Sequence, residues 1–292
     1  MGEKSLRVEA NDMKFETTLS QFAKSMGNIA CLGLDPAPEN VPYDLPHTEK
    51  IRKFFLELLD AMDKEALFPA MVKPNIAYFE KLGLEGLVLL KEIIQKFKEA
   101  GFLVTLDAKR GDIGHTSEAY AAAIYEQWGA DATTVHAYFG KEGLLPFANW
   151  GEQGKGYYVL LRTSNPSAAE VQGLSVDGKP FYLRLLDLLL SWNFSGTGLV
   201  VGATVPRALQ KVLNRMKEAQ KTLPILIPGI GTQGGEAKKI MDILKRDNSD
   251  TYTLHRLNSS SKVLYAWKEK GGDPVKAATE ALKKLLDDCH VT

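Results

Sequence analysis

Short runs of apolar residues alternate along the chain with longer segments in which apolar and charged positions recur at helical spacing. Each apolar run is closed by a polar or turn-forming residue, which is typical of buried parallel strands. The eight runs cover residues 28–34, 70–72, 103–106, 132–135, 157–161, 199–201, 225–227 and 252–257. We therefore expect eight parallel strands.

The segments between these runs have the period of amphipathic helices. The clearest, residues 84–100, places Leu87, Leu90, Ile94 and Phe97 among charged residues. The others cover residues 51–65, 116–128, 180–192, 206–219, 235–244 and 274–286. Alternation of strands and helices indicates a parallel sheet. Eight repeats favour a closed (β/α)8 barrel, the TIM barrel, over an open doubly wound sheet.

The chain has 292 residues, of which 45% are apolar, and this suffices for one barrel with a large core. We expect a single domain over residues 16–292, preceded by a polar extension of residues 1–15. No apolar run approaches membrane-spanning length, and the first residues lack the apolar stretch of a signal peptide. Residues 165–179 form the longest irregular stretch, which is equally consistent with an active-site lid and with a surface insertion.

Positive and negative side chains balance, with 36 Lys and Arg against 36 Asp and Glu. This balance argues against nucleic acid or a membrane surface as a partner, but it is compatible with a small anionic ligand. Two cysteines, Cys31 and Cys289, cannot form a disulfide framework, so we expect a cytoplasmic protein. The five scattered histidines lack metal-ligand spacing, so no metal site is expected.

Polar residues and glycines close the apolar runs, at the strand ends where barrels of this kind carry their active sites. These residues are Asp35, Lys73, Asp107, His136, Ser164, Gly229 and Asn258. The pattern fits an enzyme mouth, and it also fits ordinary turn chemistry.

A dense charged run, residues 107–112, follows the third apolar run and contains Asp107, Lys109 and Asp112. In extended backbone geometry Asp107 and Lys109 point to the same side. A solvated loop of alternating charges would show the same pattern. Lys73 closes the preceding run, however, and would complete an alternating array of lysines and aspartates. Such an array keeps all its members ionised, because opposite charges favour ionisation.

The run resembles the D-x-K-x-x-D motif of the orotidine 5′-monophosphate decarboxylase family. Further stretches resemble this family in the same order, over roughly residues 30–265: residues 32–36, 73–75, 163–166, 228–235 and 258–260. The resemblance implies a cofactor-independent decarboxylase with a TIM-barrel fold. It also implies a nucleotide substrate and a homodimer with shared active sites.

The resemblance assigns roles by position. Lys109 would donate the proton, Asp107 would lie against the substrate carboxylate, and Lys73 would join Asp35 in a network that binds the ribose hydroxyls. Asp112 and Thr116 would reach into the neighbouring subunit's site, and Ser164 would read the pyrimidine ring. The remaining expected substrate-binding residues are Asn75, Pro228, Gln233, Gly234 and Gly235, the last three holding the phosphate.

The glycine-rich loop at residues 229–234 formally matches G-x-G-x-x-G. A dinucleotide site is rejected, because the loop lies late in the chain and the next apolar run does not end in an acid. Its place after the seventh run instead favours a phosphate site. Ser261 stands where the family usually has a phosphate-binding arginine. Lys262 is the better substitute, and Arg256 is less suitable because it lies within the eighth run.

The resemblance therefore implies decarboxylation of orotidine 5′-monophosphate to UMP and CO2, with Lys109 protonating the C6 carbanion and no cofactor. Losing CO2 at this carbon leaves a carbanion without an electron sink, so preorganised charge must stabilise it. Two alternatives stay open. One is a metal-dependent sugar-phosphate decarboxylase or aldolase of the same superfamily. The other is a non-catalytic barrel that binds a phosphate ligand.

Overall fold

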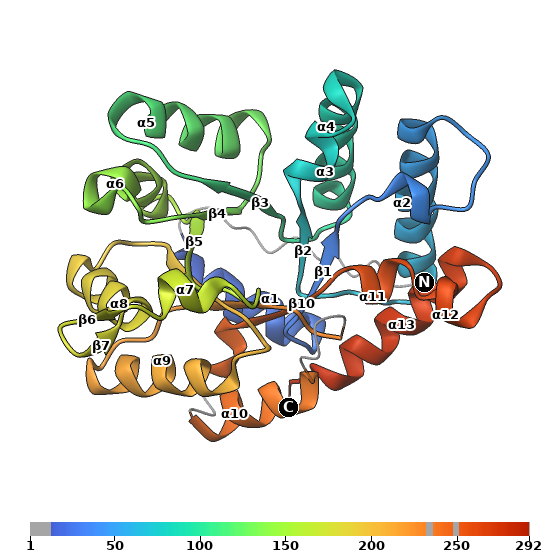
Figure 1. Ribbon diagram of the computed structural model, residues 1–292. Helices are drawn as coiled ribbons and strands as arrows, with labels where there is room; N and C mark the ends of the chain where they lie inside the picture. The colour runs from blue at the N-terminus through green and yellow to red at the C-terminus, as the bar shows by residue number, and fades with distance from the viewer. Residues whose placement is uncertain (1–12, 232–235, 248–250, 292) are drawn as a thin grey trace.

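Eight parallel strands form a barrel in the computed structural model, which describes residues 13–231, 236–247 and 251–291 (Figure 1). The strands run in the order β2-β1-β10-β9-β8-β5-β4-β3, and a bridge between Val72 and Val104 joins β2 to β3. The bounds are β1 Ala30–Leu34, β2 Met71–Pro74, β3 Thr105–Arg110, β4 Ala132–Val135, β5 Gly156–Arg162, β8 Thr197–Val201, β9 Ile225–Pro228 and β10 Arg256–Ser259. The TIM barrel expected from the sequence is confirmed.

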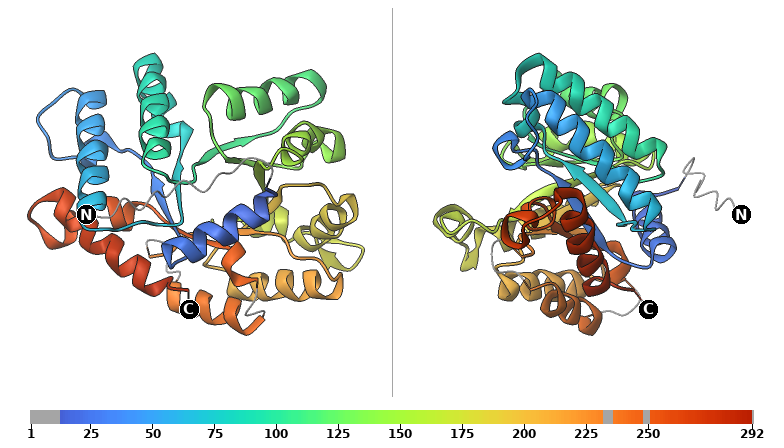
Figure 2. Two further views of the ribbon diagram at one scale, coloured as in Figure 1. Left: turned by 180° about the vertical axis from the view of Figure 1, so that it is seen from behind. Right: turned by 90° about the vertical axis from the view of Figure 1, so that its right-hand side faces the viewer.

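Helices surround the barrel, and all of those that follow except α12 bury residues in its core (Figures 1 and 2). They are α2 His47–Lys64, α3 Ile76–Glu80, α4 Gly83–Glu99, α5 Gly114–Ala122, α6 Gly140–Gly151, α8 Phe181–Trp192, α9 Pro206–Glu218, α10 Ala237–Asp247, α11 Ser261–Leu264, α12 Trp267–Lys270 and α13 Pro274–Asp288. A π-helical turn, η2 Ala123–Gln127, continues α5. Within the described part, no helix combines the length and apolar character needed to cross a bilayer.

The first helix, α1 Phe15–Met26, lies across one end of the barrel (Figure 2, left). Phe15 is 1% exposed and packs edge-on against Tyr158, with ring centroids 5.8 Å apart. Gly156 makes this possible, because a Cβ there would lie 2.2 Å from the Phe15 ring. The guanidinium of Arg256, wholly buried, donates a 2.6 Å hydrogen bond to the carbonyl of Leu19. The helix therefore seals the amino-terminal end of the barrel.

Three local expectations differ from the structure. The eighth strand is β10, Arg256–Ser259, and not residues 252–257, because Tyr252–Leu254 form a short 3-10 helix. Helix α6 was not expected, since Pro146 and three glycines break its helical pattern. Residues 165–179 hold a helix, α7 Ala168–Gln172, and most of a small hairpin, β6 Ser175–Val176 with β7 Lys179–Pro180.

Candidate active site

The carboxylate of Asp107, in β3, accepts three side-chain hydrogen bonds at the carboxyl end of the barrel strands. The ammonium of Lys73, from β2, donates to Oδ2 over 2.8 Å, and that of Lys109 donates to Oδ1 over 2.7 Å. The hydroxyl of Thr134, from β4, also donates to Oδ1 over 2.7 Å. Residues from three neighbouring strands thus hold one carboxylate between two ammonium groups. Sequence reasoning missed Thr134, whose only signal was its alternating position in a strand.

Burial and charge act in opposite directions on the pKa values of this cluster. Burial alone would lower the pKa of Lys73, but the carboxylates of Asp107 and Asp35 raise it above its ordinary value. Burial would likewise raise the pKa of Asp107, but the Lys73 and Lys109 ammonium groups hold it well below its usual range. Lys73 and Asp107 are only 3% and 8% exposed, and these two pKa shifts keep the buried ion pair charged at neutral pH.

The backbone of Lys109 lies in the left-handed region, with a φ of 46°. The extended geometry expected at this residue is therefore wrong, and the pairing of β3 with β4 shifts register between Leu106 and Arg110. The amide of Lys109 donates to Thr134 Oγ1 over 3.0 Å, which holds this turn. Such conformations cost on the order of 1–3 kcal/mol and cluster at functional sites. The Lys109 side chain contacts Asp107 and remains 50% exposed.

Asp112 and Thr116 lie outside the cluster that one chain forms. Asp112 Oδ1 accepts a 2.8 Å hydrogen bond from the amide of Ile113, and in the described residues no bond joins it to Lys73 or Lys109. Thr116 is exposed on α5. Within one chain the array is thus Lys73–Asp107–Lys109.

Asp35 follows β1 and lies near Lys73, whose pKa it helps to raise. Its Oδ1 atom is buried and has no hydrogen-bond partner within the described part of the chain. The Tyr265 hydroxyl donates to the Asp35 carbonyl over 2.8 Å and accepts from the Ala37 amide over 2.7 Å. Tyr265, which sequence reasoning missed, therefore fixes the backbone of this loop. Asn75 caps α3, since its Oδ1 accepts from the Ala77 amide.

Ser164 follows β5 and is held by residues that follow β8. A Cβ on Gly202 would lie 2.8 Å from Ser164 Cα, so glycine permits this close approach. The Thr204 hydroxyl donates to the Ser164 carbonyl over 3.1 Å. The side-chain oxygen of Gln172, in α7, accepts a 2.8 Å hydrogen bond from the Thr163 amide. This bond fixes α7 against the end of β5.

The loop after β9 begins at Pro228, whose carbonyl accepts a 2.9 Å hydrogen bond from the Ala203 amide. Gly229 and Gly231 have φ values of 96° and 88°, which only glycine adopts readily. Gln233, Gly234 and Gly235 lie outside the described residues. The described part of the loop sits beside α11, since a Cβ on Gly231 would lie 2.9 Å from Lys262 Cγ.

Lys262, on α11, donates to both carboxylate oxygens of Glu269, over 2.7 and 2.8 Å. Ser261 is the first residue of α11 and is partly buried. Arg256 cannot replace the expected arginine, because its guanidinium also donates to the carbonyls of Thr253 and His255, before β10. It therefore lies at the opposite end of the strand from the glycine loop.

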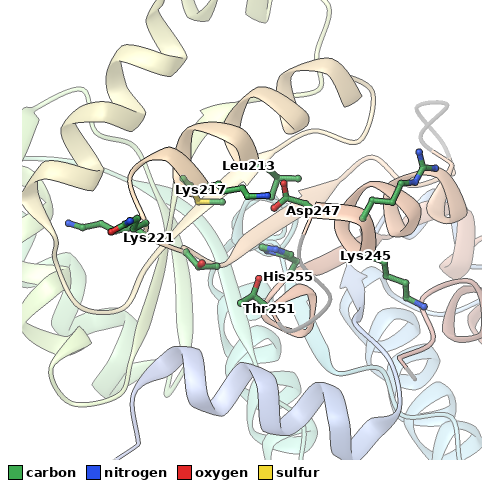
Figure 3. Close-up of a pocket in the computed structure, with 11 residues that line it drawn as sticks. Leu213, Lys217, Lys221, Lys245, Asp247, Thr251 and His255 are labelled. Carbon is green, nitrogen blue, oxygen red and sulfur yellow. The ribbon is translucent and has the colours of Figure 1, made fainter.

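A cavity of about 520 Å³ lies at the amino-terminal ends of β9 and β10, away from the charged cluster (Figure 3). Lysines line it, but Lys221 donates to the Leu190 carbonyl and Lys245 to that of His290. Burial lowers the pKa of His255 to about 3, so this side chain is neutral. The described residues bring no group of three or more potential metal ligands together.

The sequence model of the orotidine 5′-phosphate decarboxylase/HUMPS family matches residues 30–254. Orotidine 5′-phosphate decarboxylase of Cupriavidus metallidurans is 40% identical over 263 residues, covering 88% of this chain and 92% of that protein. The enzyme of the same name from Roseiflexus sp. is 37% identical over 279 residues, covering 94% and 97%.

The fold comparison agrees with the sequence comparison. The structure of Leishmania donovani OMP decarboxylase superposes with a TM-score of 0.74 at 31% identity, covering 94% of this chain and 98% of that one. Both comparisons extend over nearly the whole barrel, including the strand ends that carry the charged cluster. The chain belongs to the orotidine 5′-phosphate decarboxylase family.

Proposed function

We propose that this protein is a carboxy-lyase that converts orotidine 5′-monophosphate to UMP and CO2 without a metal or organic cofactor. The observation that carries the proposal is the Lys73–Asp107–Lys109 array at the mouth of a barrel of this family. The reaction breaks the bond between C6 and the carboxylate carbon, and the electron pair stays on C6. Lys109 then transfers a proton from Nζ to C6.

The array suits this reaction because its charges are fixed before the substrate arrives. The half-exposed ammonium of Lys109 stabilises negative charge as it develops at C6. Asp107 repels the substrate carboxylate more than it repels neutral CO2, which favours the bond-breaking step. Lys73 keeps Asp107 ionised within the buried part of the site.

The substrate-binding roles follow the positions of polar groups around the mouth. Asp35 Oδ1, which has no partner among the residues that the structure describes, is available to accept a hydrogen bond from a ribose hydroxyl. Ser164, held by Thr204, would contact the pyrimidine ring, and Pro228 would begin the phosphate loop. Lys262 beside that loop would contact the phosphate. Asn75 would border the ribose site from the start of α3.

A homodimer would bring Asp112 and Thr116 to the neighbouring active site. Large apolar side chains are exposed next to Asp112, just before α6 and on α6: Ile113, Tyr138, Phe139 and Leu145. Exposed apolar clusters of this kind mark interaction surfaces, and symmetric dimers are the commonest assembly. Cys31 and Cys289 are both buried free thiols, which supports a reducing, cytoplasmic location.

Decay of the absorbance of orotidine 5′-monophosphate tests this function. The purified protein should decarboxylate the nucleotide at the same rate with and without a chelator. Loss of activity in the chelator, together with turnover of a sugar phosphate, would favour the metal-dependent alternative. Binding of UMP without any turnover would favour the non-catalytic barrel.

A further inference from the structure

Lys262 and Glu269 form an ion pair beside the glycine loop, next to Ser261, which replaces the arginine expected from the family resemblance. The Lys262 ammonium lies 2.7 and 2.8 Å from the two carboxylate oxygens of Glu269. Both oxygens are thus engaged by one cation. The group best placed to replace the arginine is therefore bound to a carboxylate in this structure.

The stem of Lys262 packs directly against the glycine loop. A Cβ on Gly231 would lie 2.9 Å from Lys262 Cγ and 3.2 Å from its Cβ. Because Gly231 has no Cβ, the Lys262 stem can occupy this space. Gly231 also adopts a φ of 88°. The ammonium sits at the end of a flexible chain. Rotation about the bonds of that chain would carry it from α12 toward the loop.

The ion pair is weak enough to be displaced. The Lys262 and Glu269 side chains are 46% and 67% exposed, so water screens their attraction. Glu269 would remain hydrated after losing its partner, because it is not buried. A phosphate carries more charge than a carboxylate and forms stronger charge-assisted hydrogen bonds.

We infer that Glu269 competes with the nucleotide phosphate for the Lys262 ammonium and so sets the affinity of the phosphate site. The inference rests on the proposed function, since the phosphate is that of the nucleotide. Glu269 is a positioning residue, because it acts through Lys262 and does not touch the substrate. It therefore affects binding of phosphorylated ligands and leaves the decarboxylation step unchanged.

Calorimetric binding of UMP and of uridine separates this role from a structural one. Glu269→Gln should bind UMP about two- to fivefold more tightly, because the free energy of one exposed ion pair no longer has to be lost when UMP binds. Lys262→Ala should bind UMP about tenfold more weakly, since a charge-assisted bond is lost. Adding Glu269→Gln to Lys262→Ala should have no further effect. Uridine, which lacks the phosphate, should bind all variants equally.

Glu280→Gln is the matched control, because Glu280 forms a similarly exposed pair with Lys270 over 3.2 Å. This variant should bind UMP as the unaltered protein does. Unchanged or weaker UMP binding by Glu269→Gln would overturn the inference, as would an effect that persists in the Lys262→Ala background. Absence of decarboxylation by the unaltered protein would count against the proposed function alone, because the UMP measurements do not require turnover.

Discussion

Asp107 is held in place by hydrogen bonds and by the opposite charges of Lys73 and Lys109. The sequence predicted its partners Lys73 and Lys109, since both stand at or after strand ends. It could not predict Thr134, because a strand hydroxyl gives no sign of its partner. The left-handed backbone of Lys109 could not be predicted either. Its conformational strain is offset by tertiary contacts that the sequence does not reveal, such as the hydrogen bond to Thr134.

Replacing Asp107 with asparagine should destabilise the protein in a way that depends on pH. The variant leaves Lys73 buried without its counter-ion, which typically costs about 3–5 kcal/mol of unfolding free energy. The folded-state pKa of Asp107 is depressed, so its contribution is fully present above about pH 4, the pKa of an unfolded aspartate. The contribution is lost as the pH falls further.

Urea unfolding at pH 7, 5 and 3 measures this difference. The gap between the unaltered protein and Asp107→Asn should be the same at pH 7 and 5 and should narrow at pH 3. Asp177→Asn serves as control, because the Asp177 side chain is 76% exposed and its ion pair with Arg184 spans 3.7 Å. A gap that widened in acid would contradict the assigned charge state.

The helices and strands differ in how strongly the sequence pattern predicts them. The expected helix at residues 84–100 corresponds to α4 Gly83–Glu99, because its amphipathic period is unbroken. Helix α6 was not predicted, because Pro146 and glycines interrupt its amphipathic pattern. The run at residues 252–257 was read as a strand, because an apolar run alone cannot distinguish a strand from the 3-10 helix Tyr252–Leu254 that precedes β10.

Helix α1 should contribute to stability and leave catalysis nearly unchanged. Phe15→Ala removes a buried ring and should lower the unfolding free energy by about 3–5 kcal/mol. The rate constant for decarboxylation should hardly change, because α1 lies at the opposite end of the barrel from Lys109. Denaturant unfolding and steady-state kinetics on one preparation provide the check. Leu188→Ala, at a position 39% exposed, should have a much smaller effect on stability.

At the scale of the whole molecule, eight apolar runs that alternate with helical segments were enough to predict the fold. Closure depends on contacts that no local pattern reveals, such as the bridge between Val72 and Val104. The sequence also indicated Asp112 as part of the array, whereas one chain leaves it outside. In the proposed homodimer a second copy of the chain would account for this position, since Asp112 would then complete its neighbour's site.

Complementation between two inactive variants tests the shared sites. Lys109→Ala and Asp112→Ala should each be inactive alone, since in the proposed dimer each active site would need Lys109 from one subunit and Asp112 from the other. After random subunit exchange, about half of the dimers are mixed, and each mixed dimer contains one intact site out of two. Roughly a quarter of all active sites should therefore recover activity. Mixed dimers that formed without recovering activity would show that the sites are not shared.

The Lys109→Ala variant provides the most direct measurement of the central claim, that this ammonium protonates C6. Its turnover of orotidine 5′-monophosphate should fall by several orders of magnitude, because the proton donor and the stabilising charge are both lost. Its melting temperature should stay close to that of the unaltered protein, since the side chain is half exposed. A folded variant that retained near-normal turnover would contradict the role assigned to Lys109.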